Sequence, residues 1–119
     1  KFRALLENET GRWWEYYTTL HKPAWNDPFF GAKIIVKDLQ FTGLLDKNGR
    51  EIYEGDCCAV TDPYNGATAG PARVMFSYEY VGGWVLTSDG ENRLNIGTRT
   101  QHVAVIGNIH ENPKLMEEI

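Results

Sequence analysis

The sequence has little cysteine. Its 119 residues contain two, Cys57 and Cys58, and these are adjacent. Two cysteines are too few for a small fold that is held together by disulfides. Neighbouring residues of a strand point to opposite faces of the sheet, so an unstrained bridge between this pair is not expected. The sequence therefore predicts two free thiols in a reducing compartment.

Long apolar runs and an excess of basic charge are also missing. The apolar runs reach only about four residues, as at 103–106, and none could span a membrane. The net charge of −4 and the pI of about 5.3 argue against a chain built for non-specific binding to nucleic acid or anionic membranes. The first six residues are followed by polar ones, without the apolar stretch of a signal peptide. This predicts a cytoplasmic protein.

Helical periodicity and internal repeats are nearly absent, and short runs of aromatic and β-branched residues take their place. Gly, Pro, Asn and Asp separate these runs, which is the pattern of strands joined by turns. Strands are expected at residues 2–6, 13–20, 33–41, 44–45, 52–53, 57–60, 72–80, 84–86, 94–96 and 101–106, with a loop at 61–70. The first two runs form a predicted hairpin. The sequence therefore indicates a mainly β fold, an antiparallel sandwich or small barrel.

The pattern also predicts a set of buried side chains and a short helix. Period-2 alternation predicts that most of one set of side chains lies in the interior, namely Phe41, Val60, Val74, Phe76, Val85, Val103 and Val105. Asn112 suits an N-cap and Pro113 suits a first helical position, so a short C-terminal helix is expected after them. Two turns of helix cannot stand alone in water, so this helix must pack on the barrel or fray.

Two segments and the start of the chain carry a recognisable signature. Residues 39–56 read LQFTGLLDKNGREIYEGD, residues 105–115 read VIGNIHENPKL, and residues 1–4 read KFRA. In these segments, and in their order, the chain resembles the YopX-like proteins of bacteriophages and prophages. It departs from the family pattern at Leu45, at the Cys57-Cys58 pair and at His110, where charged, apolar and tyrosine residues are commoner.

The resemblance implies a phage or prophage origin, a bacterial cytoplasmic setting and a β-rich fold with an SH3-type barrel. The rhythm of residues 54–74, a Gly-Asp turn, a strand, a loop and a second strand, is also similar to an SH3-type barrel. This is an analogy of fold and implies no activity. On this scheme residues 1–38 form an N-terminal hairpin extension with an aromatic loop, and residues 39–119 form the barrel and the C-terminal helix.

The signature positions have structural explanations. The side chains of Asp46 and Asn48 suit the closing of a turn that ends at Gly49. Asp56, which follows Gly55 at the entrance of a strand, suits hydrogen bonds to backbone amides. A signature that consists of turns and caps does not point to a catalytic site.

No catalytic, cofactor or metal site is predicted. Cys57 or Cys58 could act as a nucleophile with His21, His102 or His110 as base, but this needs an exposed, activated thiolate that nothing in the sequence indicates. The same residues lack the spacing of metal ligands. Glu51, Glu54 and Asp56 could serve acid–base chemistry or bind a cation, although a solvated strand rim explains them more simply. No phosphate-binding glycine motif is present.

Aromatic residues form the main binding signal. Trp25, Phe29 and Phe30 lie in the Pro-containing loop 21–31 and are the candidate binding surface, for a protein partner or for a second copy of the chain. Arg12-Trp13-Trp14 and the same loop could instead form a stacking platform for single-stranded nucleic acid. We therefore expect a non-enzymatic accessory protein that acts by protein binding or self-association. The alternatives are a nucleic-acid-binding SH3-type barrel and an enzyme.

Overall fold

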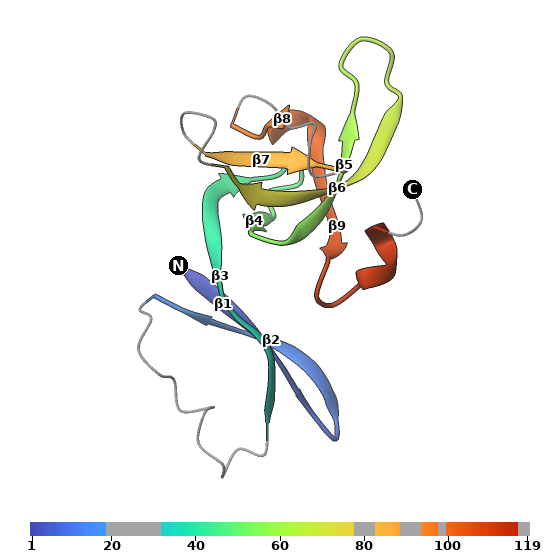
Figure 1. Ribbon diagram of the computed structural model, residues 1–119. Coiled ribbons are helices and arrows are strands. Elements are labelled where there is room, and N and C mark those ends of the chain that lie inside the picture. The colour runs from blue at the N-terminus through green and yellow to red at the C-terminus, as the bar shows by residue number, and fades with distance from the viewer. Residues whose placement is uncertain (19–31, 78–82, 89–93, 98–99, 117–119) are drawn as a thin grey trace. The chain divides into compact units, whose positions relative to one another are not determined.

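The computed structural model describes residues 1–18, 32–77, 83–88, 94–97 and 100–116 (Figure 1). These residues form nine strands and two short 3₁₀ helices, so the mainly β prediction is confirmed for the described part of the chain. The chain divides into two compact units, Lys1–Phe41 and Thr42–Ile119. The candidate loop with Trp25, Phe29 and Phe30 lies outside the described residues. No helix of the described residues is long and apolar enough to cross a membrane.

The first unit is built on the predicted hairpin. β1 (Phe2–Asn8) pairs antiparallel with β2 (Gly11–Tyr17), from Phe2 opposite Tyr17 to Asn8 opposite Gly11. The side chain of Asn8 closes the turn, because its Oδ1 accepts hydrogen bonds from the backbone N–H and the hydroxyl of Thr10 at 2.8 and 2.6 Å. The other edge of β1 pairs antiparallel with the first part of β3 (Lys33–Leu45).

Rings and cations share the surfaces of this small sheet. The guanidinium of Arg3 lies 3.8 Å from the ring centroid of Trp14, and the amino group of Lys1 lies 5.8 Å from that of Tyr16. Phe2 stacks on Tyr17 with the ring centroids 5.9 Å apart. These contacts join Lys1 and side chains of β1 to side chains of β2 that lie opposite or diagonal to them, and such cross-strand pairs stabilise a sheet.

Asp38 holds an unusual backbone conformation in β3. Its φ is +61°, a left-handed value that aspartate tolerates better than most residues. The hydroxyl of Tyr17 donates to the Asp38 carboxylate at 2.5 Å and accepts from the Asp38 backbone N–H at 2.6 Å. The hydroxyl of Tyr17 therefore pairs with both the carboxylate and the backbone N–H of Asp38, the residue at which β3 departs from regular strand geometry.

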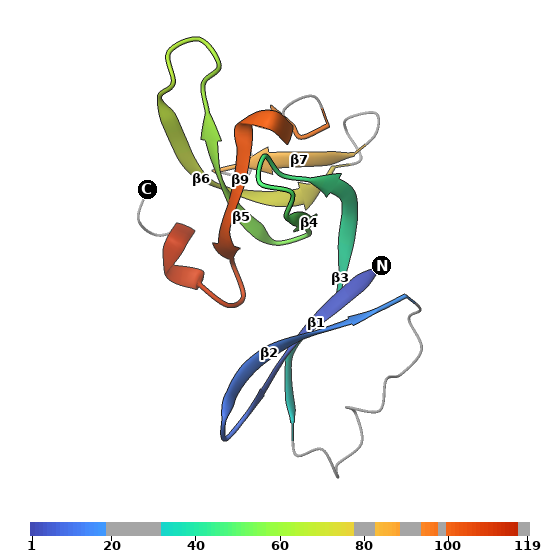
Figure 2. The same cartoon turned by 180° about the vertical axis from the view of Figure 1, so that it is seen from behind.

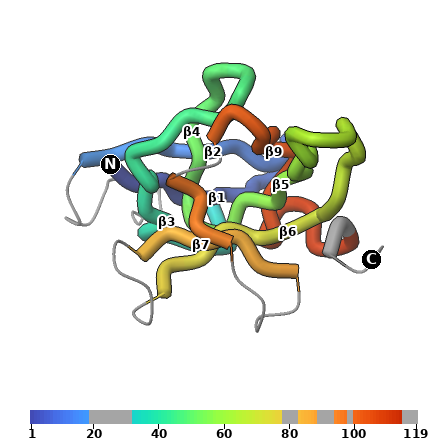
Figure 3. Tube along the Cα trace, turned by 90° about the horizontal axis from the view of Figure 1, so that it is seen from above, coloured from blue at the N-terminus to red at the C-terminus, as the bar shows by residue number. Residues whose placement is uncertain are grey.

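The second unit is a curled antiparallel sheet. Its strands are β5 (Asp56–Thr61), β6 (Thr68–Phe76), β7 (Trp84–Thr87), β8 (Leu94–Asn95) and β9 (Val103–Asn108), in the order β8-β7-β6-β5-β9. The short strand β4 (Glu51–Tyr53) pairs with β3. Figure 2 shows β9 beside β5, and Figure 3 shows the curvature of the strands from above.

The core of this unit is one cluster of buried side chains. It consists of Ile52, Cys58, Ala72, Val74, Leu86, Ile96, Val103 and Val105. Of the seven side chains predicted to be interior, Val74, Val85, Val103 and Val105 are buried, and Phe41 and Val60 are half-buried. The prediction is wrong for Phe76, which is 43% exposed and lies edge-on to Trp84 with the ring centroids 5.3 Å apart. Phe76 is the last residue of β6, where the alternation continues but the sheet that would cover it ends.

Two predicted elements differ in extent. The loop expected at 61–70 is shorter, because β6 already begins at Thr68. Where the C-terminal helix was expected, the described residues form the four-residue 3₁₀ helix η4 (Pro113–Met116), and the last three residues of the expected helix lie outside the described part of the chain. Asn112 turns back toward β9: its backbone N–H donates to the Asn108 carbonyl at 2.6 Å, and its Oδ1 accepts from the Asn108 N–H at 3.4 Å. The side chain expected to cap a helix is therefore used to close a turn after β9.

Candidate functional site

The β5–β6 hairpin extends beyond the other strands of its unit (Figure 1). Its tip, residues 62–67, is the sequence DPYNGA, and four hydrogen bonds hold it. Asp62 Oδ1 accepts from the Tyr64 N–H at 2.8 Å, and Asn65 Oδ1 accepts from the Ala67 N–H at 2.8 Å. The Asp62 carbonyl accepts from the Gly66 N–H at 2.9 Å, and the Asp62 N–H donates to the Ala67 carbonyl at 2.8 Å.

This bonding gives the tip a fixed conformation. The two side-chain acceptors make Asx turns, Pro63 restricts φ, and Gly66 supplies the positive φ of +72° that closes the loop. The tip presents Tyr64, whose exposed fraction of 96% is the highest among the exposed large hydrophobic side chains of the described residues. A large ring is therefore held in solvent by a loop that has little conformational freedom left.

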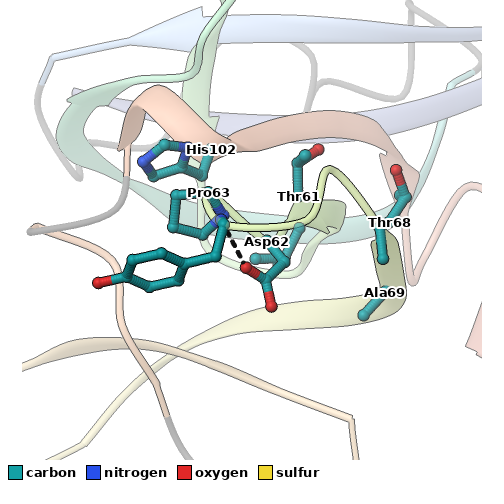
Figure 4. A pocket seen from close by; sticks show the side chains of 9 residues that line it. Thr61, Asp62, Pro63, Thr68, Ala69 and His102 are labelled. Atoms are coloured by element: carbon teal, nitrogen blue, oxygen red, sulfur yellow. Dashed lines mark hydrogen bonds between the residues drawn. The ribbon is translucent and has the colours of Figure 1, made fainter.

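A groove lies beside this tyrosine. We call it the hairpin groove; it has a volume of about 600 Å³ and is lined by Val60, Thr61, Asp62, Pro63, Tyr64, Ala67, Thr68, Ala69 and His102. Figure 4 shows residues of the tip along one side and His102 nearby. His102 comes from the 3₁₀ helix η3 (Thr100–His102), which precedes β9. The volume falls in the range of sites that take small ligands or peptide side chains.

The two cysteines are poor candidates for a nucleophile. Both are free thiols, as predicted, and both are fully buried on β5. Burial and the neighbouring Asp56 carboxylate raise the pKa of both thiols above the usual range. The thiolate is the reactive form, so neither side chain is activated.

Glu51, Asp56 and His110 make separate structural contacts, and the candidate base His21 lies outside the described residues. Glu51 accepts from the Tyr53 hydroxyl at 3.2 Å, and Asp56 accepts hydrogen bonds from amide groups in the core. His110 packs against Gly55, and burial lowers the pKa of its imidazole. Within residues 1–18, 32–77, 83–88, 94–97 and 100–116, no three His, Cys, Asp or Glu side chains are placed to hold a metal ion.

The predicted nucleic-acid platform is engaged within its own unit. Arg12 makes an ion pair with Glu7 at 2.7 Å, Trp13 donates its indole N–H to Glu15 at 3.0 Å, and Arg3 covers the ring of Trp14. A base that stacked on the face of Trp14 covered by Arg3 would have to displace the guanidinium. These contacts weigh against a platform at this place.

The two signature segments meet in the second unit. Asp46 is buried, and its Oδ1 accepts from the N–H groups of Asn48 and Arg50, which confirms the predicted turn for the Asp46 side chain; Asn48 takes part through its backbone N–H. Its Oδ2 reaches across to the N–H of Val105 at 2.9 Å, a residue 59 positions later. Asp56, also buried, accepts from the Tyr53 N–H at 2.8 Å, which confirms its predicted bond to a backbone amide.

Asp56 makes the second connection between the segments. Its Oδ1 accepts from the side-chain amide of Asn108 at 3.1 Å, and the Gly55 carbonyl accepts from the Ile109 N–H at 2.9 Å. Residues 46–56 and 105–109 are therefore joined by three hydrogen bonds that cross more than fifty positions of sequence. These bonds tie the Asp46 turn and the start of β5 to β9, in addition to the strand pairing of residues 57–60 with β9.

One family model matches nearly the whole chain. The family model described as YopX protein matches residues 2–117. The chain belongs to the YopX family. No curated protein matches it closely enough to count as a relative.

Sequence reasoning missed the hairpin groove of this YopX-family chain. It placed residues 61–70 in a loop and gave no role to Tyr64. The available signal was the spacing of Asp62, Asn65 and Gly66, which is that of a loop closed by its own side chains around one aromatic residue. The contribution of His102 could not be anticipated, because it comes from a segment about forty positions away.

Proposed function

We propose that this YopX-family chain is a non-enzymatic accessory protein of a phage or prophage that binds a protein partner in the bacterial cytoplasm. The family membership and the resemblance of its signature support the origin and the setting. The observation that carries the binding role is the preorganised hairpin tip, which holds Tyr64 in solvent beside the hairpin groove.

The physical reason is the cost of ordering a binding surface. Association normally loses the conformational freedom of loops and side chains, and a loop that is already fixed avoids much of this loss. Tyrosine is enriched among the few residues that dominate binding energy, because it buries a large area with few rotatable bonds. A fixed, exposed tyrosine next to a groove has the properties of such a residue.

We also propose that the second unit is an SH3-type barrel. Strands β5 to β8 form a meander, the 3₁₀ helix η3 follows, and β9 returns to pair with β5. This order of elements is the one found in SH3-type barrels and supports the assignment, which carries no argument about activity.

The binding role is tested by capture followed by measurement on the purified pair. The tagged full chain is used to capture partners from an induced host, and the captured protein is then purified and titrated by calorimetry. We expect Tyr64→Ala to weaken binding by about tenfold or more, the effect of losing a dominant interface residue. Tyr16→Ala is the matched control, because Tyr16 is a half-exposed tyrosine in the other unit.

Three results would contradict the proposal. Equal affinity of Tyr64→Ala and the wild type would remove the hairpin tip as the interface. A salt-dependent gel shift with single-stranded nucleic acid would favour the nucleic-acid alternative, because phosphate contacts release counterions and weaken with salt. Turnover abolished by a single substitution would show an enzyme. Circular dichroism on each variant establishes that it is folded.

A further inference from the structure

The lining of the hairpin groove is partly apolar and partly polar, with Thr61, Thr68 and His102 among its polar residues, and it contains one carboxylate. Val60, Ala67 and Ala69 supply apolar surface, and Asp62 supplies the acidic group. The carboxylate uses Oδ1 to accept from the Tyr64 N–H. Within the described part of the chain Oδ2 has no partner, and Figure 4 shows it directed away from that bond.

The charge of the second unit has the same sign as Asp62. By sequence, residues 42–119 carry eleven Asp and Glu against six Lys and Arg, whereas residues 1–41 carry five against six. The net negative charge of the whole chain therefore comes from the unit that bears the groove. A field of this sign attracts cationic partners and repels anionic ones.

Resting on the proposed function, we infer that the occupant of the hairpin groove is an extended basic segment of the partner protein. A Lys or Arg of this segment lies against Asp62 Oδ2 and the ring of Tyr64, which joins an ion pair to a cation–π contact. The apolar residue next to it packs on Val60 and Ala69. A second copy of the chain fits less well, because two acidic units would face each other across the interface.

Two small probes test the chemistry of the groove directly. The full-length ¹⁵N-labelled chain is titrated with N-acetyl-leucyl-arginine amide and, separately, with N-acetyl-leucyl-glutamate amide. We expect the arginine probe to shift the amide resonances of residues 60–62, 64–69 and 102 with millimolar affinity, and the glutamate probe to leave them in place.

Asp62→Asn is the matched variant, because an asparagine Oδ1 can still accept from the Tyr64 N–H while the charge is lost. It should weaken binding of the arginine probe by about two- to fivefold, the range of an exposed ion pair. Glu9→Gln removes one exposed carboxylate from the first unit and should leave the affinity unchanged.

Each contrary result is distinct. If the arginine probe leaves the groove resonances in place, or if Asp62→Asn binds it as the wild type does, the basic occupant is wrong. If the groove resonances shift when the protein alone is diluted, the occupant is a second copy. A negative result here, with partner binding still dependent on Tyr64, overturns the inference and leaves the proposed function standing.

Discussion

The two units of the chain differ in the contacts that stabilise each of them internally. Residues Lys1–Phe41 bury the aliphatic side chains of Ala4, Leu5, Leu6 and Leu39 and add cross-strand pairs of rings and cations. Residues Thr42–Ile119 depend on a buried apolar core and on two buried carboxylates that join segments more than fifty positions apart. The comparison teaches where each unit is vulnerable. Polar truncation and acid should affect the second unit, whereas the first should respond to the loss of single ring contacts.

The largest effect is expected from Asp46→Ala. The substitution leaves three backbone N–H groups without their acceptor, one of them on the buried strand β9. Because an unsatisfied buried donor costs ~1–3 kcal/mol, we expect the free energy of unfolding to fall by about 3–4 kcal/mol. Urea denaturation followed by far-UV circular dichroism measures this. Asp62→Asn serves as the control, since its carboxylate lies on the surface, and a loss below about 1 kcal/mol for Asp46→Ala would show that Asp46 is not a structural tie.

A double-mutant cycle at Asp56 and Asn108 should give the next effect. Asp56→Ala removes the acceptor for the Tyr53 N–H and for the Asn108 side-chain amide, both buried, so a loss of about 2–3 kcal/mol is expected. Asn108→Ala removes one of the same hydrogen bonds, so the losses of stability from the two substitutions should not add in full. A coupling of at least ~0.5 kcal/mol between the two substitutions is the expected sign of direct contact. Strict additivity would mean that the side chains act independently.

Acid should destabilise the second unit by a smaller amount than truncation, because a protonated carboxyl keeps part of its accepting capacity. Burial alone would raise the pKa of Asp46, but the N–H groups of Val105, Arg50 and Asn48 favour the carboxylate and hold the pKa below its usual range. The pKa of Asp46 is lower in the folded state than in the unfolded state. The stability that the Asp46 carboxylate contributes is therefore complete above about pH 4 and is lost as pH falls through the folded-state pKa. Thermal unfolding between pH 7 and pH 2 measures the loss, and Asp46→Asn should flatten that part of the profile. An unchanged profile in Asp46→Asn would assign the acid sensitivity to other groups.

The sequence predicted the local half of this arrangement. The Asp46 turn, the Asp56 bond to a backbone amide and the β1–β2 hairpin depend on residues within a few positions, and all three are confirmed. The bond from Asp46 to Val105 was not predictable, because turn chemistry carries no information about a strand 59 positions later. Phe76 shows a different limit: its register opposite Trp84 follows the alternation, but alternation does not tell where the cover of a sheet ends. The hairpin groove was only partly predictable for the same reason. The turns of its tip depend on residues within a few positions, whereas His102 comes from a distant segment of the sequence.

The smallest predicted effect concerns the first unit and the hydroxyl of Tyr17. Tyr17→Phe keeps the stacking on Phe2 but removes the group that binds the Asp38 carboxylate and backbone N–H, so we expect a loss of about 1 kcal/mol. Burial and the Asp38 carboxylate raise the pKa of Tyr17 to about 12, from an ordinary value of 10. Because the folded-state pKa is the higher one, the contribution of Tyr17 is complete below pH 10 and is lost as pH rises toward 12.

Ultraviolet difference titration of the wild type and Tyr17→Phe checks this contact, and the variant should show one late-titrating tyrosine fewer than the wild type. Asp38→Gly separates the two roles of the contact. Glycine relieves the left-handed backbone and removes the carboxylate, so Tyr17 should titrate earlier than in the wild type, although burial still raises its pKa, while stability changes little. If Tyr17 titrates near its ordinary pKa of 10 in the wild type, the contact with Asp38 does not hold β3 in its left-handed conformation.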